Sequence, residues 1–253
     1  MVGNPRGAWV ARERSRLVRQ FRARARPSAG ETLRSYLGSP VPVLGLSVPE
    51  FRVLVRSTAR NVADRPVSDV FRLVRDLWAG SVYEEKLAAI ELLGQRPLVG
   101  AARSWHLASR WVDQATGWAL SDSLASGPVA AMVAASPKRF GELQRWTRSR
   151  NPWRRRASTY ALRAWVRSGD LDRPFRVLER LADDRERWVQ RAVGTWLREC
   201  WKKDRGRTER FLRREAHHLA PVTITVATER APRKLREELR RAAANSRPPR
   251  RGL

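Results

Sequence analysis

A single carboxylate interrupts a repeated pattern in this chain, and it is the residue whose type most suggests chemistry. Aromatic residues recur every 35 positions, at Tyr83, Trp118, Trp153 and Trp188. Four positions after each aromatic, the chain carries Leu87, Asp122, Ala157 and Ala192. A carboxylate at an otherwise apolar position lowers stability unless it is hydrogen-bonded or paired. Asp122 is therefore a candidate functional residue, and an aspartate that faces solvent or caps a neighbouring helix is the alternative.

Basic and aromatic residues share the same period, and together they suit a polyanion. Three positions after the aromatic, three of the four repeats carry a cation: Lys86, Arg156 and Arg191. The planar fork of arginine binds phosphate oxygens bidentately and stacks on bases. Most tryptophans pack in cores, but indoles beside arginines also suit stacking or contact with sugars. We call Lys86, Arg156 and Arg191 the basic ladder. Trp118, Trp153 and Trp188 recur with the same 35-residue period.

The elements that would position these residues are helices. Apolar residues recur three and four apart between Gly and Pro breakers, which predicts about twelve helices of roughly 10–16 residues. A period of 35 in a helical pattern indicates an all-α, HEAT-like solenoid, in which stacked helix pairs line a concave basic face. We predict one solenoid domain over residues 1–229, with residues 1–8 flexible. A basic C-terminal helix and a disordered tail are expected over residues 230–253.

The charge of the chain favours a nucleic-acid partner. The 253 residues include 52 Lys and Arg against 25 Asp and Glu, a formal charge of +27 at neutral pH. The hydrophobic content of 42% is near the globular norm, so the chain is not simply a disordered basic tail. Nucleic acid is the leading candidate polyanion and a membrane surface the second. The alternative explanation of this positive charge is codon bias, because a GC-rich genome favours arginine codons.

Several functional classes are disfavoured by composition. One cysteine, Cys200, excludes a disulfide framework and a cysteine-based zinc site. Three histidines give little material for a catalytic metal centre. We find no apolar run long enough for a transmembrane helix and no secretory signal. The expectation is a cytoplasmic, nucleoid-associated protein with no metal, no cofactor and no membrane contact.

An ordered set of short motifs resembles the AlkD-like DNA alkylation repair glycosylases, over about residues 35–220. Each motif alone is weak, but their order and spacing are fairly specific. The motifs are VLGLSVP at 43–49, LW at 77–78, YEEKLAAI at 83–90, WALSD at 118–122, WRRRA at 153–157, VQRAVG at 189–194 and LRE at 197–199.

The resemblance implies a HEAT-like fold and a specific activity. Members of that family remove N3- or N7-alkylated purines from double-stranded DNA as monomers, without a metal and without base flipping. The match assigns Trp118 and Asp122 to the catalytic site and Arg156 to the DNA backbone. The second cleft tryptophan of the family aligns with Thr195, and Trp196 is its neighbour. This departure bears on substrate range or activity.

Three functions remain open from the sequence. The first is a DNA-alkylpurine N-glycosylase, a hydrolase of base excision repair. The second is a non-catalytic HEAT-like protein that binds damaged or branched DNA, which Thr195 favours. The third is a scaffold for acidic proteins. Neither the alkyl adduct nor the choice between general repair and self-resistance to a DNA-alkylating natural product follows from the sequence.

Overall fold

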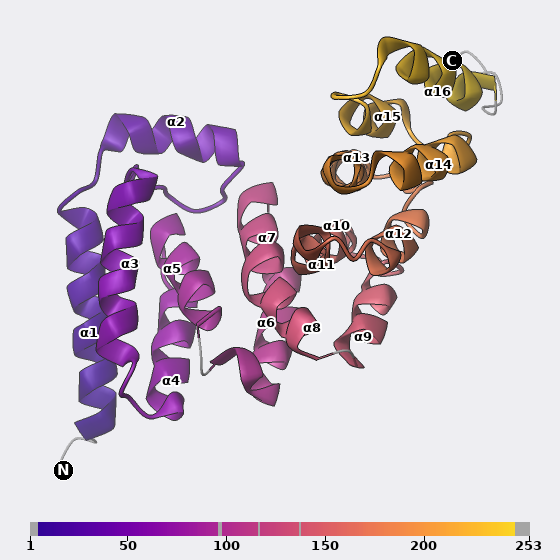
Figure 1. Ribbon diagram of the computed structural model, residues 1–253. Coiled ribbons are helices and arrows are strands. Elements are labelled where there is room, and N and C mark those ends of the chain that lie inside the picture. The colour runs from indigo at the N-terminus through magenta and orange to yellow at the C-terminus, as the bar shows by residue number, and fades with distance from the viewer. Residues whose placement is uncertain (1–4, 96–97, 116, 137, 246–253) are drawn as a thin grey trace. The chain divides into compact units, whose positions relative to one another are not determined.

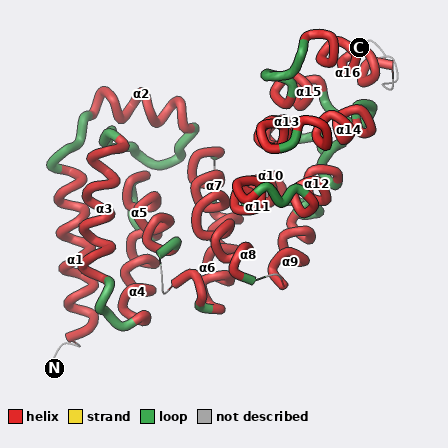
Figure 2. Tube along the Cα trace, viewed as in Figure 1, coloured by secondary structure: helices red, strands yellow, loops and turns green. Residues whose placement is uncertain are grey.

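All secondary structure in the described part of the chain is helical. The computed structural model describes residues 5–95, 98–115, 117–136 and 138–245. Within these ranges no strand is present (Figures 1 and 2). The predicted all-α, helical-repeat class is therefore confirmed, whereas the predicted concave basic face stays a prediction. None of the described helices is long and apolar enough to cross a membrane.

The chain divides into two compact units, Met1–Ala135 and Ser136–Leu253. In the first unit, α4 packs on α5, α1 packs on α3 and α4, and α5 packs on α7. Its elements are α1 (Pro5–Arg22), α2 (Pro27–Leu37), α3 (Val48–Val62), α4 (Val67–Trp78), α5 (Tyr83–Leu93), the 3-10 turn η1 (Leu98–Gly100), α6 (Ala102–Gln114), α7 (Trp118–Leu124), the π-helical turn η2 (Ala125–Val129) and α8 (Ala130–Ala135).

The second unit is built around a long central helix, α13, which packs on α10, α14 and α15. Gly194 of α13 permits a close approach to α15, because a Cβ there would lie 2.8 Å from the carbonyl oxygen of Thr223. The elements are α9 (Lys138–Trp146), α10 (Pro152–Tyr160), α11 (Arg163–Ser168), α12 (Asp172–Glu179), α13 (Arg187–Lys203), α14 (Arg205–Glu215), α15 (Pro221–Ala227) and α16 (Arg233–Asn245).

The 35-residue repeat corresponds to helix starts. Tyr83 and Trp118 are the first residues of α5 and α7, while Trp153 and Trp188 are the second residues of α10 and α13. At α10 the start is specified locally, since Pro152 occupies the first turn and the Asn151 side chain accepts a hydrogen bond from the Trp153 amide at 3.0 Å. All four aromatics of the repeat therefore stand within the first two residues of a helix.

The chain ends are partly described. Helix α1 begins at Pro5, inside the segment predicted to be flexible, and residues 1–4 lie outside the described residues. Helix α16 lies within the segment predicted to be a basic helix, while residues 246–253 of the predicted tail lie outside. The single domain over residues 1–229 stays a prediction.

Candidate active site and nucleic-acid interface

Asp122 lies in the second turn of α7 and is only 9% exposed. Directly after α7 the backbone widens into the π-helical turn η2, where Pro128 cannot donate a backbone hydrogen bond. The hydroxyl of Ser126 donates to the carbonyl oxygen of Asp122 at 2.7 Å. Single π-helical turns inside helices are frequent at functional sites. The burial of Asp122 argues against an aspartate that simply faces solvent.

Tyr83 shares an electrostatic environment with Asp122. Burial raises the pKa of Tyr83 to about 12, and the charges of Glu84 and Asp122 contribute to the same shift. The two residues lie on packed helices, α5 and α7. The Tyr83 phenol therefore keeps its proton at neutral pH and stands within electrostatic range of the Asp122 carboxylate.

The indole of Trp118 is held in place by the end of α2. Its Nε1 donates to the carbonyl oxygen of Tyr36 at 3.3 Å, and the two rings meet edge to face at 5.5 Å. Gly117, with φ +82°, allows this contact, since a Cβ there would lie 2.8 Å from the carbonyl oxygen of Gly38. Trp118 is half-buried, whereas Tyr36 is 69% exposed. We call Tyr36, Tyr83, Trp118 and Asp122 the α7 cluster.

A depression of about 450 Å³ also involves α7. Lys86 lies in its lining and is half-buried; its Nζ donates to the carbonyl oxygen of Trp78 at 2.6 Å and lies 5.3 Å from the Trp78 ring. Burial lowers the pKa of Lys86, and the charge of Glu85 opposes that shift. The ammonium group is thus engaged with Trp78. The lining residues are Pro40, Val41, Trp78, Ala79, Lys86, Gln114 and Leu120.

The predicted basic residues of the second unit differ in exposure. Arg156 is buried; its Nη1 donates to the carbonyl oxygen of Trp188 at 2.5 Å and its Nη2 to the Tyr160 hydroxyl at 3.1 Å. Arg191 is exposed, and its guanidinium makes no hydrogen bond or ion pair among the described residues. Of the three predicted ladder cations, Arg191 alone presents its charge freely to solvent.

The predicted aromatic residues of the second unit fall into two environments. Trp153 and Trp188 lie with ring centroids 6.1 Å apart and ring planes inclined by 33°. Trp196 is buried and meets Tyr160 edge to face at 5.7 Å. Thr195 is half-buried, and its hydroxyl donates to the carbonyl oxygen of Arg191 at 2.9 Å. Trp196 thus packs in the core of this unit, while Trp188 faces solvent.

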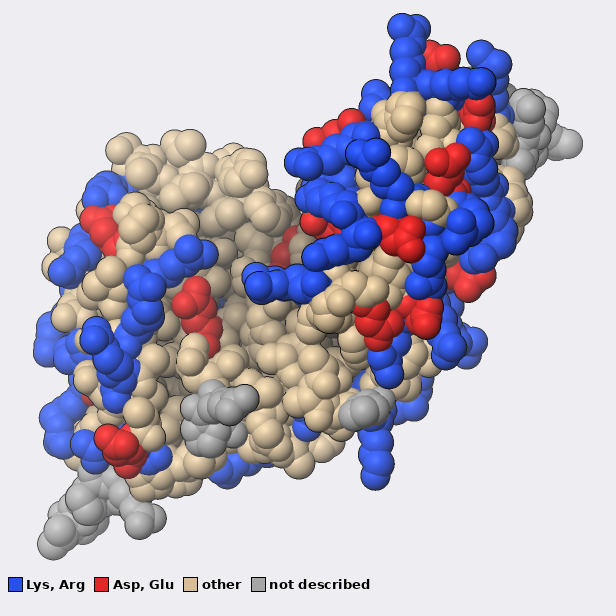
Figure 3. Space-filling view, viewed as in Figure 1, with Lys and Arg blue, Asp and Glu red and all other residues tan. Residues whose placement is uncertain are grey.

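An arginine row on α3 is a candidate interface that sequence reasoning missed. Arg52, Arg56 and Arg60 are four residues apart, so they lie on one side of the helix, and all three are exposed. None of them has an ion pair or hydrogen bond to its side chain within the described residues. Burial raises the pKa of Glu91, while the charges of Arg52 and Arg56 oppose that shift. Figure 3 shows basic side chains gathered over α3. The spacing of four was the signal available in the sequence.

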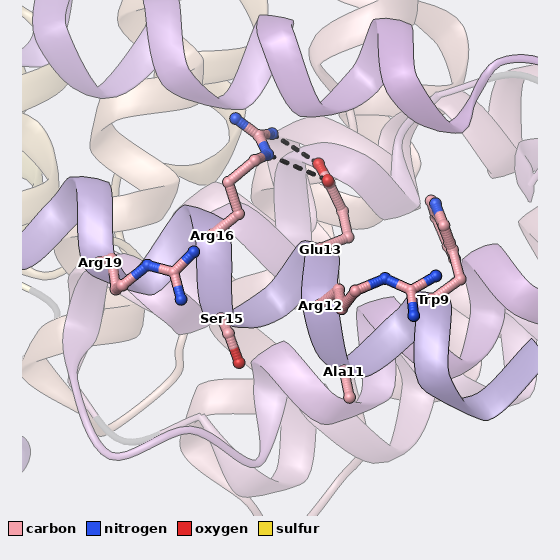
Figure 4. Close-up of a pocket in the computed structure, with 7 residues that line it drawn as sticks. All are labelled: Trp9, Ala11, Arg12, Glu13, Ser15, Arg16 and Arg19. Carbon is pink, nitrogen blue, oxygen red and sulfur yellow. Dashed lines mark hydrogen bonds and ion pairs between the residues drawn. The ribbon is translucent and has the colours of Figure 1, made fainter. Parts of the chain in front are cut away.

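A second depression, of about 600 Å³, runs along α1 (Figure 4). Arg16 and Glu13 point toward each other there and form an ion pair at 2.5 Å. Burial raises the pKa of Glu13, but hydrogen bonds from Arg16 and Asn61 outweigh it and hold that pKa below its usual value. This pair is internally satisfied. Arg12 and Arg19, which are exposed, are the free cations of this surface.

The sequence of this chain was compared with models of known protein families, and one family matches. A family model described as DNA alkylation repair enzyme matches residues 17–231. The chain belongs to this family. Among curated proteins, no significant match is found.

Solved structures support the fold of this DNA alkylation repair protein. A predicted DNA alkylation repair enzyme from Enterococcus faecalis superposes with a TM-score of 0.73 at 16% identity, over 83% of this chain and 98% of that one. AlkD2 from Streptococcus mutans superposes with a TM-score of 0.58 at 17% identity, over 85% of this chain and 97% of that one. At these identities the likeness concerns the fold.

In the part of the chain that is described, potential metal ligands are not grouped and the thiol is buried. No group of three or more His, Cys, Asp or Glu is placed there to hold a metal ion. Cys200 is a buried free thiol, and burial raises its pKa to about 12. A thiol of such high pKa and no exposure is a poor nucleophile.

Proposed function

We propose that this protein is a DNA glycosylase that hydrolyses the N-glycosidic bond of cationic N3- or N7-alkylated purines in duplex DNA without base flipping. The observation that carries the proposal is the burial of Asp122 on α7, one turn from the half-exposed indole of Trp118 and within electrostatic range of Tyr83. Membership of the DNA alkylation repair enzyme family supports the same activity.

The chemistry of a cationic alkylpurine needs little more than one carboxylate. The positive charge on the base weakens the glycosidic bond, so the leaving group needs no proton from the protein. As the bond breaks, positive charge develops on the sugar, and a nearby carboxylate stabilises it and orients the attacking water. Asp122 is suited to this role because its burial strengthens its interaction with a cation. The face of Trp118 adds a cation–π attraction.

The position of the α7 cluster supports reaction without base flipping. Trp118 is half-exposed and Tyr36 mostly exposed, so the aromatic part of the cluster reaches the protein surface. A surface cluster of this kind can approach a sugar from outside the duplex. Enzymes that extrude the base instead receive it in an enclosed pocket.

DNA binding in this proposal comes from exposed arginines. Arg191 and the α3 row of Arg52, Arg56 and Arg60 present exposed guanidinium groups that make no hydrogen bond or ion pair among the described residues, and they would contact phosphates in any sequence. Arg156 is buried and acts through Trp188, whose carbonyl oxygen it holds. Lys86 is likewise half-buried, and it acts by holding the carbonyl oxygen of Trp78. We further propose that the protein works as a monomer at the nucleoid.

A non-catalytic protein that binds damaged or branched DNA is the second candidate. Thr195 stands where the resemblance places a second cleft tryptophan, and its hydroxyl is engaged with its own helix. A site with one indole in place of two can still bind DNA through its arginines. The two candidates differ in whether a base is released.

The Asp122→Asn variant tests the catalytic assignment. The change keeps the shape and the hydrogen-bonding capacity of the side chain and removes its charge. We expect excision from duplex DNA carrying one N7-alkylguanine to fall by about 10²–10³-fold. Binding to an unreactive abasic analogue changes far less, and the protein stays folded, since the amide keeps the size and shape of the carboxylate. Single-turnover excision, binding titration and thermal melting give the three quantities.

Asp76→Asn on α4 is the matched control, because Asp76 is exposed and the change in charge is the same. It is expected to leave excision unchanged. Intact excision by Asp122→Asn together with a destabilised fold would show that Asp122 is a structural carboxylate.

A further inference from the structure

The indole of Trp188 is exposed to a degree that packing does not explain. Its residue is 47% exposed, and among the described residues the other large apolar side chains with high exposure are Tyr36, Val48 and Val53. Water contact with so much aromatic surface is unfavourable, and tryptophan is the side chain with the most such surface to bury. An exposed aromatic on a well-packed helix therefore points to a ligand.

The Trp188 ring packs against a second indole, and the backbone of Trp188 is held by a hydrogen bond. Trp153 lies against it, with a centroid distance of 6.1 Å and an inclination of 33°, an arrangement within the range of favourable aromatic pairs. The buried guanidinium of Arg156 donates to the carbonyl oxygen of Trp188, and the Gln190 side chain donates to the carbonyl oxygen of Asp184 at 2.7 Å. The first turn of α13 is thus fixed from two sides, and the indole is presented before any ligand binds.

Free positive charge flanks the ring. Arg187 and Arg191 are exposed, lie one residue before and three residues after Trp188, and have no ion pair or hydrogen bond to their side chains among the described residues. Lys and Arg outnumber Asp and Glu by more than two to one in the second unit, and Figure 3 shows this excess over its helices. Arg191 lies on the side of α13 that carries Trp188, and Arg187 directly precedes Trp188, so an indole with cations near it matches a ligand with a flat ring next to anionic groups.

We propose that Trp188, backed by Trp153, is a stacking platform for one unpaired nucleobase in DNA, with Arg187 and Arg191 on the neighbouring phosphates. The inference rests on the proposed DNA binding but not on glycosylase chemistry, since the α7 cluster takes no part in it. A paired base is already stacked on both faces, whereas an unpaired base has a face to offer. Stacking on an aromatic side chain is independent of sequence and adds about 1–3 kcal/mol per base, roughly 5- to 150-fold in affinity.

The test compares three DNA molecules of one sequence: a continuous duplex, the same duplex with one bulged 2-aminopurine, and the duplex with an abasic residue in place of the bulged base. We expect the bulged base to bind most tightly and its fluorescence to fall as it stacks on the indole. Trp188→Ala should lower binding to the bulged duplex by roughly 5- to 150-fold, to the level of the abasic duplex. Trp188→Phe should retain most of the preference.

Two control variants make the result specific. Trp9→Ala removes a half-buried indole from α1 in the first unit and should leave the preference intact. Arg191→Gln should weaken binding to all three DNA molecules alike. Thermal melting of Trp188→Ala should show a folded protein with a modest loss of stability, because the lost ring is half-exposed and packs only partly on Trp153.

Equal binding of the three molecules by the wild type, or a preference that survives in Trp188→Ala, would overturn the platform. An excision assay separates this outcome from the proposed function. Excision without a bulge preference removes the platform alone, whereas a bulge preference without excision removes the glycosylase and leaves the platform standing.

Discussion

At the scale of single residues, Tyr83 and Asp122 interact electrostatically. The Asp122 charge helps to raise the pKa of Tyr83 to about 12, after burial as the larger cause. A phenol with this pKa stays protonated through the neutral range. Its titration therefore reports on the carboxylate next to it.

This proximity gives a prediction about tyrosine titration. In NMR spectra of protein with ¹³C-labelled tyrosine, the Tyr83 resonance should stay at its protonated position up to about pH 10.5, and Tyr83→Phe assigns the signal. In Asp122→Asn the midpoint should move to lower pH, because removing a negative charge stabilises the phenolate. An unchanged midpoint in that variant would mean that the two side chains do not interact.

Some site residues could be predicted from the sequence and others could not. Asp122 could be predicted because it is a carboxylate at a repeat position that is otherwise apolar. Trp118 could be predicted because it follows the 35-residue repeat of aromatic residues. Tyr36 was not visible, since it reaches Trp118 from α2, outside the repeat phase. The burial of Arg156 was also hidden, because a spacing of three assigns a side chain to a helix face but does not say that Trp188 and Tyr160 cover it.

At the scale of elements, the junction before α7 controls where Trp118 stands. Gly117 adopts φ +82° against the carbonyl oxygen of Gly38. The helix that follows is only seven residues long before the π-helical turn. A displacement at its first residue is therefore transmitted to Asp122 within one turn.

Gly117→Ala should destabilise the protein and reduce excision, although it removes no functional group. The control is Gly169→Ala, with φ +83° and ψ 2° in the left-handed region and nothing within 4 Å of a Cβ, whereas Gly117 has φ +82° and ψ 162°, a conformation that glycine alone adopts readily. We expect the control to lose roughly 1–2 kcal/mol from backbone strain alone. Gly117→Ala should lose more, and excision should fall by up to about 10²-fold from misplacement. Denaturant unfolding and single-turnover excision measure both, and equal losses in the two variants would contradict the role of the Gly38 contact.

Helix boundaries could be predicted where capping residues determine them. They were harder to predict where packing between helices determines them. Ser47 and Glu50 at the start of α3 form a reciprocal capping box, which residue types alone suggest. The β-branched segment 222–226 has a poor helix propensity, yet it forms most of α15. Its extensive packing on α13 accounts for the helical conformation. No local sequence pattern predicts that α13 is the helix on which it packs.

At the scale of the whole molecule, the charge of +27 should dominate affinity for undamaged DNA. Each phosphate that a cation neutralises releases counterions, so the logarithm of the binding constant falls linearly with the logarithm of salt concentration. Exposed arginines without partners contribute fully to that slope. Arginines that are already paired with glutamates contribute less.

Replacing Arg52, Arg56 and Arg60 by Gln should make the salt slope shallower by up to about 3, with little change in sequence preference. The control replaces Arg213, Arg214 and Arg233, which form ion pairs with glutamates, and changes the net charge by the same amount. Its slope should change less. Titrations at four salt concentrations decide between them, and an equal effect of the two triple variants would argue for a general charge effect in place of a binding row.

The most direct test of the central claim is the identity of the product. Wild-type protein is incubated with duplex DNA carrying one N7-methylguanine, and the products are separated after subtraction of spontaneous base loss. The account predicts release of free 7-methylguanine together with an abasic strand, and a much slower release with Asp122→Asn. Tight binding to the modified duplex with no base released above the spontaneous rate would contradict it.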